Sequence, residues 1–224
     1  MLKVHTLTFN MFGVNTYIIS DDQTRECVIV DPGMMSKSEE NRLCDFLEAN
    51  NLQPKHLVNT HLHIDHVAGN NYVSNKYGLQ LKASIDDEFL GARISSQAQM
   101  FGLPINVNNV KIDSALSEND TIKIGDSEVK IICVPGHSPG SVVLHAPKER
   151  FIISGDALFQ GSIGRTDLPG GDYATLIANI KNKLLSLPDD TIVYPGHGPS
   201  TTIKNEKNYN PFLYKFGAYF DNYS

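Results

Sequence analysis

Tryptophan is absent from the 224 residues, and cysteine occurs only three times, at Cys27, Cys44 and Cys133. An odd number of cysteines at irregular spacing argues against a disulfide framework, so we expect free thiols and a reducing, cytoplasmic location. No apolar run approaches the ~20 residues that a membrane span needs, and the first residues lack the apolar stretch of a signal peptide. We therefore expect a protein without a membrane partner.

Positive charge is also scarce: Lys and Arg number 19 against 25 Asp and Glu, which gives a net charge of -6. This balance argues against a nucleic-acid partner. Hydrophobic residues make up 41% and charged residues 20%, as is usual for a globular protein. No linker or low-complexity segment divides the chain, so we predict a single domain over residues 1–224.

Strand and helix patterns alternate in two similar halves. In the first half, strands are predicted at 2–9, 15–20, 27–30 and 55–60, with helices near 37–50 and 67–77. In the second half, strands are predicted at 121–124, 128–134, 141–146, 150–153 and 191–194, with a helix near 172–186. A further helix over 86–101 is either a packed surface helix or a lid. The plan predicts an α/β fold whose two halves face each other.

The densest chemistry lies at residues 59–69, directly after the apolar pair Leu57-Val58. His61, His63, Asp65 and His66 fall within six positions. Alternate residues of an extended chain share a face, so the first three could point the same way, and His66 could turn elsewhere as a helix begins. Imidazole and carboxylate together suit zinc, iron or manganese, so this cluster predicts a metal site.

Three later stretches place a polar residue beside a glycine after an apolar run, at His137, Asp156 and His197. Each is weak evidence alone. With the first cluster they give seven candidate ligands, which suits two metals rather than one. We interpret the other three histidines as structural and Cys133 as a core residue. These three histidines are His5, His56 and His145.

The order His-x-His-x-Asp-His, Gly-His, Gly-Asp and Gly-His resembles the metallo-β-lactamase superfamily. Residues 159–172, Phe-Gln-Gly-Ser-Ile-Gly-Arg-Thr-Asp-Leu-Pro-Gly-Gly-Asp, resemble the glyoxalase II branch, particularly its short bacterial members, as does Asn210-Pro211-Phe212. The resemblance implies a four-layer αββα sandwich. It also implies that His61, His63 and His137 bind one metal, that Asp65, His66 and His197 bind a second, and that Asp156 bridges them.

The implied activity is dinuclear metal-dependent hydrolysis of a thioester, such as an S-acylglutathione like S-lactoylglutathione. A hydroxide bridging two divalent metals, zinc in preference to iron or manganese, would attack the carbonyl, and Asp65 would orient it. Arg165 occupies the place of the family's basic substrate contact, although an ion pair with Asp167 or Asp172 is an alternative role. The chain is too short for the branch's helical C-terminal domain, and Asp167 stands where the branch has a tyrosine. The resemblance therefore does not identify the thiol carrier of the substrate.

Two other functions are considered. A mononuclear iron persulfide dioxygenase of a related branch shares the Gly-Arg-Thr-Asp loop and would leave the second site empty, whereas His197 makes that site complete here. A metal-binding module without catalysis is a third interpretation. A class B β-lactamase usually has cysteine in the second site, and no cysteine adjoins a ligand loop in this sequence.

The end of the chain is rich in aromatic residues. Seven of the nineteen Phe and Tyr residues fall in the final sixteen positions: Tyr209, Phe212, Tyr214, Phe216, Tyr219, Phe220 and Tyr223. Disordered tails are depleted in aromatics, so we expect this segment to be ordered. It would dock on its own domain or, as the alternative, form a homodimer contact.

Overall fold

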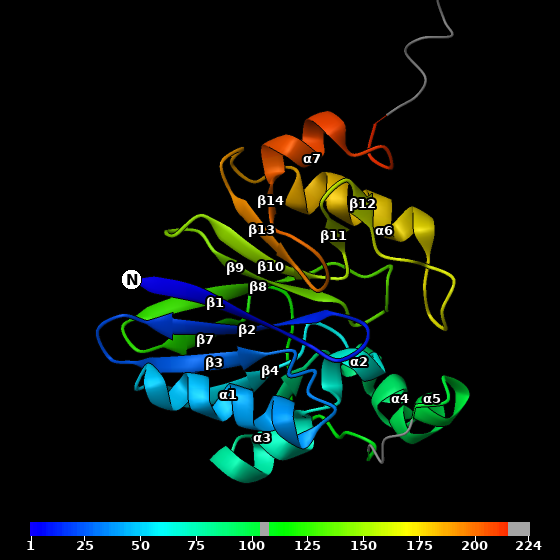
Figure 1. Cartoon of the computed structure of the whole chain (residues 1–224). Coiled ribbons are helices and arrows are strands. Elements are labelled where there is room, and N and C mark those ends of the chain that lie inside the picture. Colours follow the sequence, from blue (N-terminus) through cyan, green and yellow to red (C-terminus); the bar gives the residue numbers. More distant parts are fainter. Residues whose placement is uncertain (104–107, 215–224) are drawn as a thin grey trace, which may run out of the picture.

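Two six-stranded sheets pack face to face in the computed structural model, which describes residues 1–103 and 108–214 (Figure 1). Helices α1 (Lys37–Ala49) and α3 (Asn70–Tyr77) cover the outer face of the first sheet. Helices α6 (Tyr173–Asn179) and α7 (Ile203–Tyr209) cover the second. The predicted four-layer αββα sandwich is confirmed.

The first sheet has the strand order β1-β2-β3-β4-β5-β6, and β1 to β3 are antiparallel whereas β3 to β6 are parallel. Its strands are β1 (Leu2–Phe9), β2 (Val14–Asp21), β3 (Glu26–Val30), β4 (Gln53–Val58), β5 (Leu81–Ala83) and β6 (Ser114–Ala115). Parallel neighbours need a crossover, which α1 and α3 provide. The predicted capping serine, Ser36, accepts a hydrogen bond from the backbone N–H of Glu39 at 3.3 Å and begins α1.

The second sheet has the order β14-β13-β10-β9-β8-β7, with only β10 and β13 parallel. Its strands are β7 (Thr121–Ile124), β8 (Ser127–Cys133), β9 (Val142–Ala146), β10 (Phe151–Gly155), β13 (Ile192–Pro195) and β14 (Thr201–Thr202). A hairpin of β11 (Leu158–Phe159) and β12 (Ser162–Ile163) follows β10. Helix α6 continues into one π-helical turn, η2 (Ile180–Leu184).

Successive side chains of one strand enter two different cores, the middle core between the sheets and the outer core beneath the helices, because each sheet is covered on both faces. In β2, Tyr17 and Ile19 enter the core between the sheets, whereas Ile18 enters the core beneath α1 and α3. In β10, Phe151 and Ile153 face the middle core, and Ile152 faces α6. Burying a side chain of this size contributes about 1.5–3 kcal/mol, so the apolar runs of these strands hold the layers together.

Two predicted helices are wrong in detail. The helix over 86–101 divides into η1 (Ile85–Asp87), α4 (Glu88–Gly91) and α5 (Ile94–Met100). The helix near 67–77 becomes a short α2 (Ile64–Val67) and then α3. Gly91, the last residue of α4, lies so close to Val110 and Leu62 that a Cβ atom would meet them at 2.9 and 3.0 Å, so this position has no room for a side chain.

All three cysteines are free, as the sequence predicts. In the described part of the chain, no helix has the length and apolar character needed to cross a membrane. Of the aromatic C-terminal residues, Tyr209, Phe212 and Tyr214 are exposed, while Leu213 is buried against the outer core of the second sheet. The remaining four aromatics lie outside the described residues, so their burial stays a prediction.

Candidate metal centre

The seven side chains singled out in the sequence lie together at one edge of the two sheets. His61 and His63 follow β4, Asp65 and His66 lie in α2, and the other three follow strands of the second sheet. These three are His137 after β8, Asp156 after β10 and His197 after β13. Strand ends from both halves of the chain therefore meet at one site.

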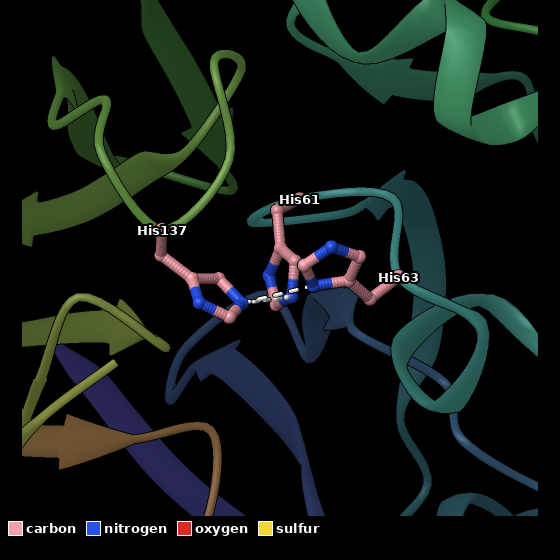
Figure 2. Close-up of side chains that lie close together, drawn as sticks. All are labelled: His61, His63 and His137. Atoms are coloured by element: carbon pink, nitrogen blue, oxygen red, sulfur yellow. Dashed lines mark hydrogen bonds between the residues drawn. The ribbon is translucent and has the colours of Figure 1, made fainter. Parts of the chain in front are cut away.

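The first group is a triad of buried histidines, His61, His63 and His137 (Figure 2). Nε2 of His137 lies 2.9 Å from Nδ1 of His63 and 3.2 Å from Nε2 of His61. The three rings approach from two loops and point toward one another. Three imidazole nitrogens converging in this way can share a metal ion.

The second group contains Asp65, His66 and His197. Oδ2 of Asp65 lies 3.1 Å from Nε2 of His197 and 3.6 Å from Nε2 of His66. The expectation that Asp65 shares a face with His61 and His63 is wrong, because the extended chain ends at His63 and α2 turns Asp65 toward the second group. The expected turn of His66 at a helix start is confirmed.

Asp156 lies between the two groups. Its Oδ2 atom is 3.6 Å from Nε2 of His137 and 3.6 Å from Nε2 of His197, and its Oδ1 atom is 3.4 Å from Nε2 of His66. Gly196 makes this approach possible, since a Cβ atom there would collide with Oδ1 of Asp156 and meet His66 at 2.7 Å. One carboxylate thus faces ligand atoms of both groups.

Hydrogen bonds to ring nitrogens fix how the histidines face the centre. Nδ1 of His137 donates to the backbone oxygen of Arg165 at 2.7 Å, and Nδ1 of His197 donates to that of Phe12 at 3.1 Å. Nδ1 of His61 lies 3.1 Å from Oγ1 of Thr60, which itself donates to a carboxylate. A proton on Nδ1 leaves Nε2 with a free lone pair, which is the form that binds a metal.

His63 is arranged the other way round. Its Nδ1 faces His137, and its Nε2 is buried without a hydrogen-bond partner among the described residues. Oδ1 of Asp156 is likewise buried without a hydrogen bond there. Buried polar atoms in proteins are rarely left without partners, so Oδ1 of Asp156, which faces the ligand atoms, suits a site that cations complete.

Asp31 is a part of the centre that the sequence reasoning missed. Its carboxylate is buried and accepts from Oγ1 of Thr60 at 2.6 Å, from the backbone N–H of Thr60 at 2.7 Å and from Nδ1 of His66 at 3.0 Å. It therefore supports one histidine of each group. Asp31-Pro32-Gly33 directly after an apolar strand was the only signal, and it reads equally well as a simple turn.

The surroundings that the protein chain itself provides shift the pKa values of these histidines in opposite directions. Burial lowers the pKa of His63 to about 3, and burial with neighbouring imidazoles places the pKa of His61 well below its usual value. Burial also lowers the pKa of His66, but Asp65, Asp156 and Asp31 outweigh it and raise the net value well above normal. Cations bound beside these carboxylates would replace that proton and leave a neutral ligand.

The donor set fits divalent cations. Five imidazoles and two carboxylates form three groups in which the ligand atoms all lie within 4.8 Å of one another, and the group that contains Asp156 shares His61 with one neighbour and His66 with the other. Nitrogen and oxygen donors of this kind suit zinc, iron or manganese. His5, His56 and His145 belong to none of the groups formed by described residues, in agreement with their structural interpretation.

The N-terminal half holds the His197 loop in place. The side-chain amide of Asn15 donates to the backbone oxygens of Pro195 at 3.0 Å and Gly198 at 2.8 Å, and the hydroxyl of Tyr17 donates to Pro195 at 2.6 Å. Both residues come from β2 in the opposite sheet. The second group therefore depends on the packing of the two sheets against each other.

Asp87 holds the loops of the first group in the same manner. This buried carboxylate accepts from the backbone N–H of Leu62 at 3.0 Å, from the hydroxyl of Ser138 at 2.8 Å and from the backbone N–H of Gly140 at 2.7 Å. Burial raises the pKa of Asp87, although these hydrogen bonds oppose the shift. Asp87 stands at the start of α4, so it links that helix to both histidine loops.

A cavity of about 400 Å³ opens beside the two groups and is bordered by His63, Asp65, His137, Asp156 and His197. Residues from the divided helix 86–101 form one wall, which supports a substrate-facing role for this segment. Its remaining walls come from Phe12 and from the loop containing Arg165. A volume of this size accommodates a small organic substrate.

Arg165 borders the cavity as predicted, and its guanidinium forms two hydrogen bonds of 2.7 Å with the carboxylate of Asp167. The ion pair that the sequence left open is therefore present. Both side chains are exposed, so the pair itself contributes little to stability.

Comparison with known proteins places this fold and site in a family. The sequence profile of the metallo-beta-lactamase superfamily matches residues 10–197. The chain is 38% identical over 214 residues to the hydroxyacylglutathione hydrolase GloC of Haemophilus influenzae, covering 95% of this chain and 98% of that protein. It is 35% identical over 202 residues to the probable metallo-hydrolase YqgX of Bacillus subtilis, covering 89% and 92%. The chain belongs to the metallo-beta-lactamase superfamily.

Solved structures agree. The B3 metallo-beta-lactamase BLEG-1 matches with a TM-score of 0.86 and 35% identity, over 95% of this chain and 100% of that one. TTHA1623, solved in a di-iron-bound form, matches with a TM-score of 0.82 and 34% identity, over 93% and 100%. Together with the named relatives, they support a metal-dependent hydrolase as the class of enzyme.

Proposed function

We propose that this protein is a dinuclear metal-dependent hydrolase of thioesters, with an S-acylglutathione such as S-lactoylglutathione as the substrate type. The observation that carries the proposal is the placement of Asp156 between two complete triads, His61, His63 and His137 on one side and Asp65, His66 and His197 on the other. The similarity to GloC supports the thioester as the bond that is hydrolysed.

Bound divalent cations would lower the pKa of a water from about 15.7 toward 7 and would polarise the carbonyl. The residues of the chain then define the geometry of the reaction. Asp65 borders the cavity, and its carboxylate would accept a hydrogen bond from the nucleophilic water and orient it. Hydrolysis forms a C–O bond and breaks the C–S bond, which releases a carboxylic acid and a thiol. An arginine at the cavity wall would contact the thiol carrier, and Arg165 is the candidate that the sequence predicts.

β-Lactam hydrolysis is a second candidate, because BLEG-1 was solved as a B3 metallo-beta-lactamase. The same seven ligands could serve attack on an amide carbonyl. The persulfide dioxygenase alternative has weaker support. The structure of ETHE1 from Myxococcus xanthus is only 24% identical to this chain and speaks for a common fold alone. A dioxygenase with one iron would also leave the Asp65, His66 and His197 triad without a role.

The direct test loads the protein with zinc or iron and compares three substrates: S-lactoylglutathione, a penicillin and glutathione persulfide. The proposal expects hydrolysis of the thioester at a kcat/KM at least about a hundredfold above that for the penicillin, with no oxygen uptake on the persulfide. Oxygen consumption with persulfide in the iron form, without thioester hydrolysis in either form, would establish the dioxygenase instead. If the protein binds metal but turns over none of the three substrates, the result would favour a metal-binding module without catalysis.

A further inference from the structure

Two arginines, Arg93 and Arg165, border the cavity beside the metal centre. They lie on different structural elements. Arg165 follows β12, whereas Arg93 occupies the break between α4 and α5. Both could in principle attract the negative charge of a substrate, so their charge environments decide between them.

The charge of Arg165 is already balanced. Its guanidinium forms a two-bond ion pair with Asp167, both bonds being 2.7 Å. The carboxylate of Asp167 cancels the charge of Arg165, so an approaching anion meets little attraction at this side chain. It would also have to displace Asp167 from the face of the guanidinium best suited to a carboxylate.

The charge of Arg93 is not balanced. Among residues 1–103 and 108–214, the arginines that form ion pairs with carboxylates are Arg25, Arg150 and Arg165, and Arg93 is not among them. Its backbone is fixed, because its N–H donates to the oxygen of Leu90 at 2.9 Å and its own oxygen accepts from Gln97 at 2.9 Å. A rigid backbone thus carries a free cation at the cavity wall.

The wall around Arg93 is apolar. Met100, Phe101 and Phe89 from the divided helix border the same cavity as Phe12 and Leu168. Four of these large side chains are exposed: Met100 (81%), Phe101 (49%), Phe12 (41%) and Phe89 (37%). Exposed apolar side chains gathered around a cavity mark a binding surface for an apolar group.

We propose that Arg93, rather than Arg165, binds the anionic group of the substrate and that the apolar wall selects the acyl group. The substrate class is then a thioester with an apolar acyl chain and a thiol carrier that bears a carboxylate. This inference rests on the proposed function and narrows it. Among S-acylglutathiones, the inference favours longer apolar acyl groups over lactoyl, because a short polar acyl group would be hydrolysed while the apolar wall stays in contact with water.

Matched thioesters test both halves of the proposal. Hexanoyl and acetyl thioesters of 3-mercaptopropionate and of its uncharged amide separate the effect of the acyl chain from that of the carboxylate. In the zinc-loaded protein, kcat/KM for the hexanoyl ester should exceed that for the acetyl ester by about tenfold or more, because more apolar surface is buried. Equal values for the two acyl groups would overturn the role of the apolar wall.

The preference for the carboxylate over the amide measures the anion site. We expect Arg93→Ala to reduce this ratio about tenfold, as for loss of one charge-assisted hydrogen bond, and Arg165→Ala to reduce it less than about twofold. Lys181→Ala, which removes an exposed positive charge outside the cavity, is the control for net charge. An unchanged ratio in Arg93→Ala, or a larger effect of Arg165→Ala, would overturn the assignment.

Binding of a stable thioether separates failure of this inference from failure of the proposed function. S-hexyl-3-mercaptopropionate and its amide cannot be hydrolysed, so calorimetry gives their dissociation constants without turnover. If zinc-loaded protein hydrolyses no thioester, the proposed function fails. Selective weakening of the carboxylate ligand by Arg93→Ala would still establish the anion site, and equal weakening of both ligands would refute it.

Discussion

The Nδ1 atom of His66 lies 3.0 Å from Oδ2 of Asp31, although the two residues are 35 positions apart in the chain. This carboxylate also accepts from Thr60, whose hydroxyl in turn contacts His61. A partner of this kind fixes the tautomer of a metal-binding histidine and increases its basicity. Asp31 therefore supports the metal-binding form of His66 directly and that of His61 through Thr60.

Asp31→Asn should weaken metal binding about 10–100-fold, as is usual when such a partner is removed. The backbone of Asp31 has φ 51, and asparagine tolerates this region as aspartate does, so the substitution acts through the lost carboxylate and its hydrogen bonds and not through backbone strain. Competition with a chromophoric chelator measures the affinity. Asp45→Asn on the exposed side of α1 is the matched control. Wild-type affinity in Asp31→Asn would show that the contact is only structural.

His197→Ala should lower occupancy of the second site and reduce thioester hydrolysis by at least about a hundredfold. His197 is the residue of that triad contributed by the second sheet, and its side chain is 26% exposed, so its loss should leave the fold intact. Metal content, hydrolysis rate and circular dichroism are the readouts, with His5→Ala as control. A variant with two metals per chain and near-normal rate would remove His197 from the centre.

The sequence predicts both halves of the sandwich and the location of all seven ligands, because the apolar runs and the glycine-flanked polar residues are local patterns. It misplaces Asp65, since alternation in an extended chain cannot show that α2 begins at Ile64. It also misses Asp31 and Asp87. Their roles depend on contacts with residues more than 20 positions away, which leave no periodic signal.

Asp87→Asn tests one of those long-range contacts. An amide would place a donor against one of the three groups that now donate to Asp87, and a buried hydrogen bond would be lost at a cost of about 1–3 kcal/mol. We expect a lower melting temperature and weaker binding at the His61, His63 and His137 site. Lower stability alone would not show that Asp87 positions the histidine loops for metal binding; a lower metal affinity of the folded protein would. If affinity measured well below the melting temperature equals that of the wild type, Asp87 serves the fold alone.

Asp21 gives a pH dependence of stability outside the metal centre. Hydrogen bonds from the backbone N–H of Thr24, from Ser127 and from Gln23 outweigh burial and hold the pKa of this carboxyl well below its usual range. A depressed folded-state pKa contributes stability above the unfolded value of about 3.9, and this contribution is lost as pH falls toward the folded value.

Asp21→Asn should therefore flatten the fall in melting temperature between about pH 5 and pH 2, while the wild type loses stability steeply there. Thermal denaturation followed by circular dichroism across this range gives the slopes. The slopes should differ most at the acid end, and identical slopes for both proteins would exclude Asp21 as a source of acid sensitivity.

The most direct test of the central claim is a crystal structure of the zinc-loaded protein with anomalous scattering at the zinc edge, combined with metal analysis. The account predicts two metals per chain, one at His61, His63 and His137 and one at Asp65, His66 and His197, with Asp156 contacting both. A single metal at the first triad, with the second triad empty at saturating zinc, would contradict the dinuclear hydrolase.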